Sequence, residues 1–384
     1  MHYISPSTGV KLRWMERPFN RKNETERYVK MSNIPKELDK NMIVSADAEG
    51  FVWYDAANLD LYGFAGIEGD TYRRLPKEVA EATNPGTVRN SSHTCGGRVR
   101  FSTDSARIAI RVKMPYMTKY DHMPMTGAAA FDMYEDFDGS HHYVCTFRCQ
   151  MTDTEGYTSK KNVVGGKMRY YTVNFPLYSP VSHLEIGIDE GAQLGEGAKY
   201  LDVPPIVYYG SSITQGACAS RPGIAYQSII NRRNEIDFVN LGFSGNAKGE
   251  QAMADYIASL DMTAFVCDYD HNAPTAEHLK ATHYNFYKTI REAHPKMPII
   301  FVSKPDFDNG YDASVARRRV IEDTFYQARE EGDKHVFYID GQGLYRGYHK
   351  EECSTDGSHP NDIGMLKMAE SIGQMLARVL RSRI

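Results

Sequence analysis

The chain has 384 residues, of which 41% are hydrophobic and 24% are charged, a composition typical of a globular protein long enough for two domains. The formal net charge of −4 leaves no basic excess for neutralising phosphates, which argues against nucleic acid as a partner. No segment approaches eighteen consecutive apolar residues, so we expect neither a membrane span nor a membrane partner.

The first ten residues, MHYISPSTGV, lack the basic segment followed by an apolar one that marks a secretory signal. We therefore expect a cytoplasmic protein, with a leader removed beforehand as the alternative.

The first half of the chain alternates apolar and polar residues with a period of two. ARIAIRVK (106–113) and HLEIGID (183–189) show this pattern, which is typical of half-buried strands. Similar stretches are AAAFDMYED, YVCTFRCQM and MRYYTVNFPLY. A run of antiparallel strands predicts a jelly-roll-like β-sandwich. We assign residues 1–200 to this domain, including the strand-like stretches GFVWYDA and NLDLYGF near its start.

The pattern changes after Pro204 and Pro205. Short apolar strands now alternate with long amphipathic stretches, the last of which is NDIGMLKMAESIGQMLARVL. The five strands expected are IVYY, FVNL, AFVCDY, PIIFVS and HVFYID. Strands that alternate with helices predict a parallel sheet covered on both faces, which we assign to residues 203–384. Functional sites in such sheets lie at the carboxyl ends of the strands.

Several polar segments follow these strands. The first strand runs into IVYYGSSITQG, where Ser211 and Ser212 could either cap the next helix or supply a nucleophile. Acyl transfer needs a hydroxyl nucleophile, a base, a carboxylate that orients the base, and donors to the oxyanion. In DGSH, Asp356 and His359 are three residues apart, so a turn would let the carboxylate reach the imidazole.

The segment GSSITQG resembles the GDSITxG block of the GDSL or SGNH hydrolases. Ser212 stands where that family has its nucleophile, and Ser211 stands where the family usually has Asp. DGSHP resembles the last block of the family, which implies that Asp356 and His359 complete a catalytic triad. The resemblance covers about residues 203–384 and implies a flavodoxin-like three-layer α/β/α domain.

The other family blocks resemble SGN, which contains Gly245, and DHNA, which contains Asn272. The third block departs from the usual GxND, because Asp270 replaces the Gly and Ala273 replaces the final Asp. The resemblance implies that the oxyanion is held by the amides of Ser212 and Gly245 and by the side chain of Asn272. No metal or cofactor is required.

Upstream, NLDLYGF resembles the GxDLY stretch of SGNH hydrolases that carry an N-terminal β-domain, with Asn58 in place of the Gly. Members with such a domain are commonly carbohydrate deacetylases, which implies a small-molecule or oligosaccharide ester as substrate. We therefore expect a serine esterase for short, acetyl-like chains, and the sequence leaves the oligomeric state open. Arylesterase, thioesterase or lysophospholipase activity are alternatives within the family.

A different class of function is also possible, namely a carbohydrate-binding protein with an inert hydrolase domain. The departures at Ser211 and around Asn272 motivate it, whereas the presence of all three triad residues argues against it. Lys304 and Asp306, in SKPDF after the fourth strand, are candidates for substrate contacts, with a solvated loop as the alternative.

The sequence gives little support to a metal site or a disulfide framework. The six cysteines form no CxxC pair, and Cys145 and Cys149 are expected to be core residues on one face of a strand. His271, His278 and His283 lack a nearby carboxylate cluster, which favours surface or partly buried histidines over metal ligands.

Overall fold

The structure, a computed structural model of the chain, describes residues 46–137, 140–305, 308–347 and 350–381. All of these residues belong to one compact unit spanning 41–384. The part of the predicted sandwich domain that covers residues 1–45 lies outside the described residues, and the boundary near residue 200 stays a prediction.

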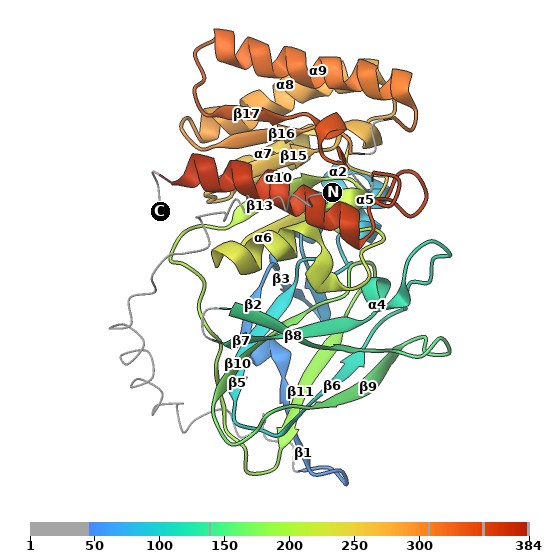
Figure 1. The fold of residues 1–384 in the computed structure, drawn as a ribbon, viewed down its shortest axis with the longest axis vertical. Helices are drawn as coiled ribbons and strands as arrows, with labels where there is room; N and C mark the ends of the chain where they lie inside the picture. Colours follow the sequence, from blue (N-terminus) through green and yellow to red (C-terminus); the bar gives the residue numbers. More distant parts are fainter. Residues whose placement is uncertain (1–45, 138–139, 306–307, 348–349, 382–384) are drawn as a thin grey trace, which may run out of the picture. The chain divides into compact units, whose positions relative to one another are not determined.

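Two antiparallel sheets make up most of the first half of the chain (Figure 1). One has the strand order β1-β11-β6-β9 and the other β12-β5-β10-β7-β8, with β2 also paired to β5. The strands are β1 (Phe51–Asp55), β2 (Asp60–Tyr62), β5 (Arg98–Thr103), β6 (Arg107–Lys113), β7 (Phe131–Phe137), β8 (Ser140–Phe147), β9 (Gly156–Asn162), β10 (Arg169–Asn174), β11 (His183–Asp189) and β12 (Leu194–Glu196).

The two sheets share one hydrophobic core because each strand turns alternate side chains inward. Ile108 and Ile110 of the first sheet and Val99 and Phe101 of the second are fully buried in the same cluster. The period-two pattern therefore identified a strand-rich N-terminal region correctly.

The second half contains a five-stranded parallel sheet with the order β14-β13-β15-β16-β17. Its strands are β13 (Ile206–Gly210), β14 (Phe238–Gly242), β15 (Ala264–Asp268), β16 (Ile299–Val302) and β17 (Val336–Ile339). All five strands predicted from apolar runs are present. Numbered along the chain, the five strands have the order 2-1-3-4-5 across the sheet. This is the order of flavodoxin-like folds, so the fold class is confirmed.

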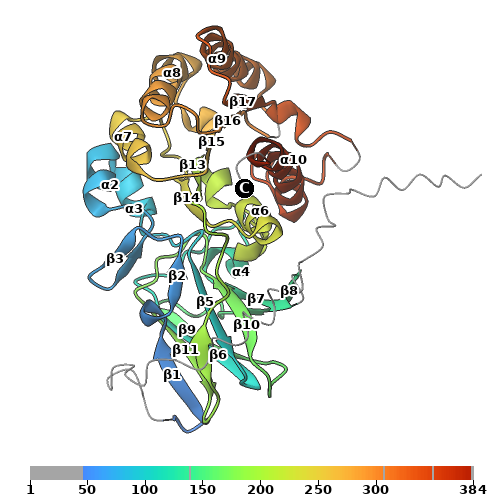
Figure 2. The same ribbon diagram turned by 90° about the vertical axis from the view of Figure 1, so that its left-hand side faces the viewer.

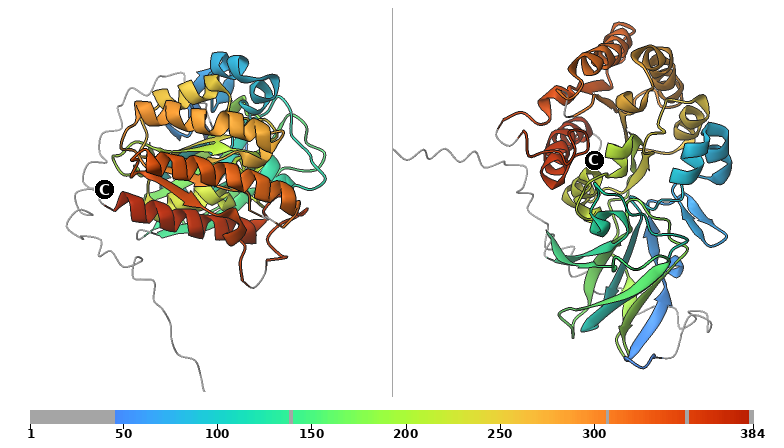
Figure 3. Two further views of the ribbon diagram at one scale, coloured as in Figure 1. Left: turned by 90° about the horizontal axis from the view of Figure 1, so that it is seen from above. Right: turned by 90° about the vertical axis from the view of Figure 1, so that its right-hand side faces the viewer.

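Helices cover both faces of this sheet (Figures 2 and 3). Side chains of β13 alternate between two cores: Tyr208 packs with α6 and α10, whereas Tyr209 packs with α7, α8 and α9. The helices are α6 (Tyr226–Asn234), α7 (Gln251–Ser259), α8 (Ala276–Ala293), α9 (Tyr311–Glu330) and α10 (Asp362–Leu380). None of the described helices is long and apolar enough to cross a membrane.

The remaining elements are short. They are η2 (Ala56–Asn58), β3 (Gly66–Glu68), β4 (Thr71–Arg73), α2 (Lys77–Thr83), α3 (Pro85–Asn90), α4 (Met125–Ala128), α5 (Ser212–Gln215), η3 (Pro222–Ile224), η4 (Asp270–Asn272) and η5 (Gly341–Gly343). The sequence analysis did not predict α2 and α3. Leu75 and Ala80 in this region belong to the core beneath α7 and α8, so the segment packs on the parallel-sheet region.

Buried arginines join the two regions. Arg74 is fully buried and donates to the backbone oxygens of His93, Asn90 and, on β14, Asn240 at 2.5–2.7 Å. Arg98 of β5 pairs with Asp237, which immediately precedes β14, and lies 4.0 Å from the centroid of the Phe238 ring. Because a buried guanidinium must have hydrogen-bond partners, these contacts fix the strand-rich region against the parallel sheet.

Candidate active site

Ser212 lies at the carboxyl end of β13, the first strand of the parallel sheet. All five residues of β13 are buried, and α5 begins directly after it. Gly210 is required at this turn, because a Cβ there would lie 1.7 Å from Oδ1 of Asp268. The Ser211 hydroxyl accepts a hydrogen bond from the amide of Ile213 and caps α5. The backbone thus presents Ser212 while it uses Ser211, which is fully buried, as a structural cap.

His359 and Asp356 lie in a tight loop before α10. The loop is closed by a bridge between Ser354 and Pro360 and by a 2.9 Å hydrogen bond from the amide of Thr355 to the carbonyl of His359. Gly357 has a φ of 76°, a left-handed conformation that favours glycine. The loop therefore folds the DGSH segment back on itself, as its spacing predicted.

The structure brings the three predicted triad residues together. The Oγ of Ser212 lies 2.9 Å from Nε2 of His359, and Nδ1 of His359 lies 2.7 Å from Oδ2 of Asp356. Ser212 is 6% exposed, whereas His359 and Asp356 expose 22% and 33% of their side chains. This is the geometry of a nucleophile, a base and a carboxylate that fixes the tautomer of the base.

The charge of Asp356 is stabilised by its own loop. Burial would raise the pKa of Asp356, but hydrogen bonds from the amide and ring of His359 and from the amide of Ser358 lower it to about 2. The carboxyl is therefore ionised at neutral pH and can hold Nδ1–H of the imidazole.

The predicted oxyanion donors lie on two loops that contact each other. The side-chain amide of Asn272 donates to the carbonyl of Phe243 at 3.1 Å, which leaves its second N–H for another acceptor. Gly245 sits in the turn closed by the hydrogen bond from the amide of Asn246 to Phe243, and its φ of 69° requires a residue tolerant of the left-handed region. The amide of Ser244 donates to the side chain of Gln215 in α5 at 2.9 Å, which ties this turn to the nucleophile helix. The catalytic roles of Gly245 and Asn272 stay predictions.

Asp268 lies directly beneath the nucleophile turn and was missed in the sequence analysis. It is fully buried, and burial raises its pKa to about 8 despite hydrogen bonds from Thr214, the backbone of Ser211 and Tyr226. The carboxyl is therefore largely protonated at neutral pH. Its contacts connect β15 with the backbone that carries Ser212.

The strand-rich region contributes side chains that the sequence analysis also missed. The hydroxyl of Tyr178 donates to the carbonyl of Ser212 at 3.1 Å. His93 contacts the side chain of Gln215 through Nδ1 at 3.0 Å and the hydroxyl of Tyr116 through Nε2 at 3.1 Å. Burial and the nearby Arg74 lower the pKa of His93 to about 3, so its ring is neutral.

The loop between β6 and α4 places further aromatic rings at the site. The rings of Tyr120 and His122 are 5.7 Å apart, and those of His122 and His359 are 5.5 Å apart. Tyr116 and Tyr120 are 41% and 43% exposed. Only a three-dimensional structure could place this loop near the triad, because it precedes His359 by more than 200 residues.

Two candidates for substrate contacts have different outcomes. The ammonium of Lys304 donates to the backbone carbonyl of Asn309 at 3.0 Å, and its backbone amide donates to Asp270. Its role in binding substrate stays a prediction. Asp306 lies outside the described residues.

The three histidines considered as metal ligands in the sequence each contact another residue. His271 contacts Asp270, His278 contacts the carbonyl of Lys248, and His283 is buried against Thr324. None of the six cysteines, all of which the structure describes, forms a disulfide. Cys145 is buried in the core of the antiparallel sheets, and Cys149 packs beside that core. Cys218 lies just after α5, is 4% exposed and has a φ of 67°.

Two family models match the chain. Residues 204–377 match the GDSL-like lipase/acylhydrolase family. Residues 51–194 match the GxDLY model, described as the N-terminus of SGNH-hydrolase-type esterases. The two models fall on the parallel-sheet region and on the strand-rich region, respectively. The comparison with curated proteins found no match.

Solved structures match over most of their length. A putative GDSL-like lipase from Bacteroides ovatus is 26% identical with a TM-score of 0.79, covering 86% of this chain and 98% of that one. The salicylyl-acyltransferase SsfX3 from a tetracycline biosynthetic pathway is 21% identical with a TM-score of 0.71, covering 87% and 98%. The acetyl xylan esterase Est2A from Butyrivibrio proteoclasticus is 12% identical with a TM-score of 0.55, covering 87% and 100%. The last two likenesses concern the fold alone.

Proposed function

This chain belongs to the GDSL-like lipase/acylhydrolase family of SGNH-type esterases, and we propose that it hydrolyses short-chain esters, acetyl esters of carbohydrates above all, with Ser212 as nucleophile. The observation that carries the proposal is the pair of hydrogen bonds that link Ser212 to His359 and His359 to Asp356. A hydroxyl, an imidazole and a carboxylate in this order activate the hydroxyl for attack on a carbonyl carbon.

In the first half of the proposed reaction, Oγ of Ser212 forms a bond to the ester carbonyl carbon while its proton moves to Nε2 of His359. Negative charge develops on the former carbonyl oxygen, toward which the amides of Ser212 and Gly245 and the side chain of Asn272 would donate. The intermediate collapses when the bond to the alcohol breaks, and the alcohol leaves with the proton from Nε2.

In the second half, water attacks the acyl-enzyme and gives a proton to Nε2. The bond between the acyl carbon and Oγ then breaks, Oγ recovers the proton, and the carboxylic acid is released. Throughout, Asp356 remains ionised and stabilises the protonated imidazole, in keeping with its low pKa.

The surroundings of Ser212 support a substrate with a polar ring and a short acyl chain. Tyr116 and Tyr120 expose ring surface near the triad, and aromatic faces commonly pack against sugar rings. Acetyl xylan esterase and family 2 carbohydrate esterase activities are named for proteins of the same fold. Acetylated oligosaccharides are therefore the first natural esters to test.

The substrate class is tested with 4-nitrophenyl esters of two, four and ten carbons and with acetylated xylo- and cello-oligosaccharides. The proposal predicts that kcat/KM falls at least about tenfold from acetate to decanoate and that acetate is released from the oligosaccharides. Turnover of the decanoate faster than the acetate would contradict the short-chain proposal. No turnover of any ester, together with binding of the oligosaccharides, would favour a binding protein with an inert hydrolase domain.

Hydrolysis must also be distinguished from transfer of the acyl group to another hydroxyl. Both reactions pass through the same acyl-enzyme, and an acyltransferase shares this fold. The test is to hydrolyse 4-nitrophenyl acetate in the presence of a sugar alcohol. Equal amounts of free acetate and 4-nitrophenol would support hydrolysis. A deficit of acetate matched by acetylated sugar would contradict it.

A further inference from the structure

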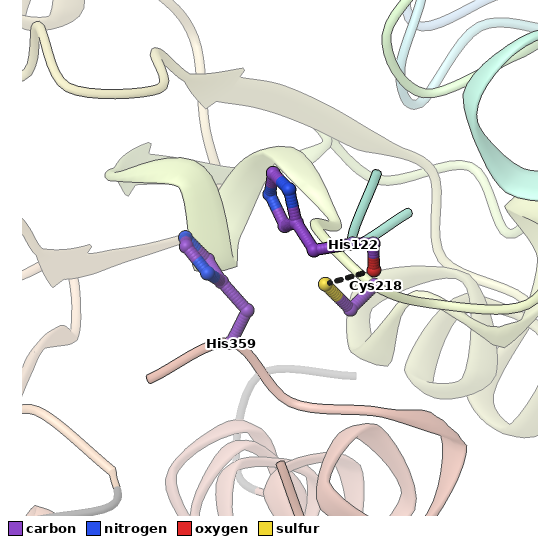
Figure 4. A group of neighbouring side chains, drawn as sticks. All are labelled: His122, Cys218 and His359. Atoms are coloured by element: carbon purple, nitrogen blue, oxygen red, sulfur yellow. Dashed lines mark hydrogen bonds between the residues drawn. The ribbon is translucent and has the colours of Figure 1, made fainter. Parts of the chain in front are cut away.

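Three potential metal ligands from distant parts of the chain converge beside the triad. His122 from the loop between β6 and α4, Cys218 from the loop after α5, and His359 each bring one ligand atom within 4.8 Å of the others (Figure 4). From these contacts we propose that the three residues form a Zn²⁺ site, and that occupation of this site inhibits the esterase. The inhibitory part rests on the proposed function, whereas the metal site does not.

The donor set suits zinc. Two imidazole nitrogens and one thiolate are ligands that Zn²⁺ binds at about 2.0–2.1 Å and about 2.3 Å, and three protein ligands leave a fourth position for water. A tetrahedral site with these bond lengths needs ligand atoms roughly 3.4–3.7 Å apart. The present spacing of up to 4.8 Å therefore has to contract by about 1 Å. The side chain of His122 is partly exposed and so has room to move.

Both histidines are already oriented by carboxylates. Nδ1 of His359 contacts Asp356 at 2.7 Å, and Nδ1 of His122 contacts Asp121 at 3.1 Å. In each ring the carboxylate occupies Nδ1 and leaves Nε2 for a metal. A carboxylate bound to the second nitrogen is the usual outer partner of a zinc-bound histidine.

Cys218 is held in position by its backbone. Its φ of 67° lies in the left-handed region, and it is one of two non-glycine residues with a positive φ in the described part of the chain. Such a conformation is unfavourable for a residue with a Cβ and is often found near functional sites. The thiol donates to the backbone carbonyl of His122 at 3.3 Å, so the sulfur lies next to the second ligand. On metal binding, the thiol proton is released to solvent.

Inhibition follows from the use of Nε2 of His359. This nitrogen lies 2.9 Å from Oγ of Ser212 and is the base of the proposed reaction. A Zn²⁺ ion bound to the same lone pair prevents it from taking the proton of Ser212. Metal binding and catalysis therefore exclude each other.

The test uses the full chain freed of metal by a chelator, with Zn²⁺ alone for affinity and Co²⁺ as a spectroscopic substitute. The inference predicts one Zn²⁺ per chain and, with Co²⁺, a thiolate-to-cobalt charge-transfer band together with tetrahedral ligand-field bands. Cys218→Ala should abolish the charge-transfer band and weaken Zn²⁺ binding at least about tenfold, because a ligand is lost. The matched control Cys149→Ala should retain both properties, since Cys149 packs beside the core of the antiparallel sheets and is not one of the three ligands. Mg²⁺, which prefers oxygen ligands, should not compete.

Inhibition is measured by the rate at which a fluorophosphonate probe labels Ser212, which needs no knowledge of the substrate. Zn²⁺ should slow the labelling of the wild type and of Cys149→Ala. The Zn²⁺ concentration that halves the labelling rate should be at least about tenfold higher for Cys218→Ala. Should Cys218→Ala fold poorly by circular dichroism, His122→Ala provides the same comparison from a different element.

Equal Zn²⁺ affinity in the wild type and Cys218→Ala, or a cobalt complex without a thiolate band, would overturn the metal site. Metal binding by a protein that hydrolyses no ester would contradict the proposed function and leave the site supported. Ester hydrolysis without metal binding would overturn only the present inference.

Discussion

The hydroxyl of Tyr178 donates a 3.1 Å hydrogen bond to the backbone carbonyl of Ser212. Tyr178 follows β10 of the strand-rich region, whereas Ser212 begins α5 of the parallel-sheet region. Both residues are buried, so this contact is made without competition from water. The strand-rich region therefore takes part in positioning Ser212, the proposed nucleophile.

Replacing Tyr178 by Phe should lower activity through this contact. The variant removes one of three hydrogen bonds to the carbonyl of Ser212, which also accepts from the amides of Gly216 and Ala217. Loss of one such hydrogen bond costs about 0.5–1.5 kcal/mol. We expect kcat for 4-nitrophenyl acetate to fall about tenfold with a smaller change in KM, measured by steady-state kinetics. Tyr208→Phe is the control, because the buried hydroxyl of Tyr208 has no hydrogen-bond partner among the residues that the structure describes. A Tyr178→Phe variant as active as Tyr208→Phe would show that the contact does not position Ser212.

Asn90 holds the turn that contains Gly245. Its side-chain amide donates to the carbonyl of Ser244 at 2.9 Å, and Asn90 is only 2% exposed. Asn90→Ala should let the turn that contains Gly245 shift and so weaken stabilisation of the oxyanion. We expect kcat to fall about tenfold or more, which is less than the loss of about 10²–10³-fold in kcat that follows removal of a whole oxyanion donor. The exposed Asn285→Ala provides a control for a lost asparagine. If kcat is unchanged in Asn90→Ala while the melting temperature falls, Asn90 serves stability alone.

Asp268→Asn should make stability less dependent on pH. Burial raises the pKa of Asp268 from 3.8 to about 8, so between these values the unfolded chain has released a proton that the folded protein keeps. The free energy of unfolding therefore falls as pH rises through this window, by up to about 1.4 kcal/mol for each pH unit. Asn mimics the neutral carboxyl and removes this slope.

The measurement for Asp268 is urea unfolding at pH 5, 6.5 and 8. We expect the loss of stability from pH 5 to pH 8 to be smaller in Asp268→Asn than in the wild type and in the control Asp312→Asn, whose side chain is exposed. Equal slopes in all three proteins would show that Asp268 is ionised in the folded state.

His141 should stabilise the contact between the two regions in a pH-dependent manner. Its ring lies between Asp136 of β7 and Glu235 after α6, and Arg100 pairs with both carboxylates. Burial alone would lower the pKa of His141, but hydrogen bonds and charges of Asp136 and Glu235 raise it to about 9. The stabilisation is therefore complete below the unfolded value of about 6.5 and is lost as pH rises through about 9.

The test for His141 compares melting temperatures at pH 6.5 and pH 9.5. His141→Gln should lower the melting temperature by several degrees at pH 6.5 and much less at pH 9.5, whereas its exposed neighbour His142→Gln should change little at either pH. A His141→Gln variant with the same deficit at both pH values would contradict a charged His141.

The parallel sheet and the pairing of Asp356 with His359 could be predicted from the sequence because their signals are local. Each strand from β13 to β17 is a short apolar run between helical patterns. Asp356 and His359 are three residues apart, so their pairing in one loop needed no knowledge of the fold. Ser212 was preferred to Ser211 from its position in the motif, and its role as nucleophile stays a prediction. In the structure Ser212 contacts His359, whereas Ser211 caps α5.

Helices α2 and α3 were not predicted, because they are seven and six residues long and owe their stability to packing on another region. The contacts of Asn90, Tyr178 and Cys218 join residues 154, 34 and 96 positions apart, respectively. No periodicity or spacing along the chain encodes such pairs. The cluster of His122, Cys218 and His359 was not considered for the same reason, since it joins three distant segments of the chain.

The central claim is tested most directly by hydrolysis of 4-nitrophenyl acetate by the wild type, Ser212→Ala and Ser211→Ala. We expect Ser212→Ala to lose activity by about 10⁴-fold or more, whereas Ser211→Ala, which removes only a helix cap, should retain most of its kcat wherever it folds. Equal rates for the wild type and Ser212→Ala would contradict a nucleophilic role for Ser212 and with it the proposed esterase mechanism.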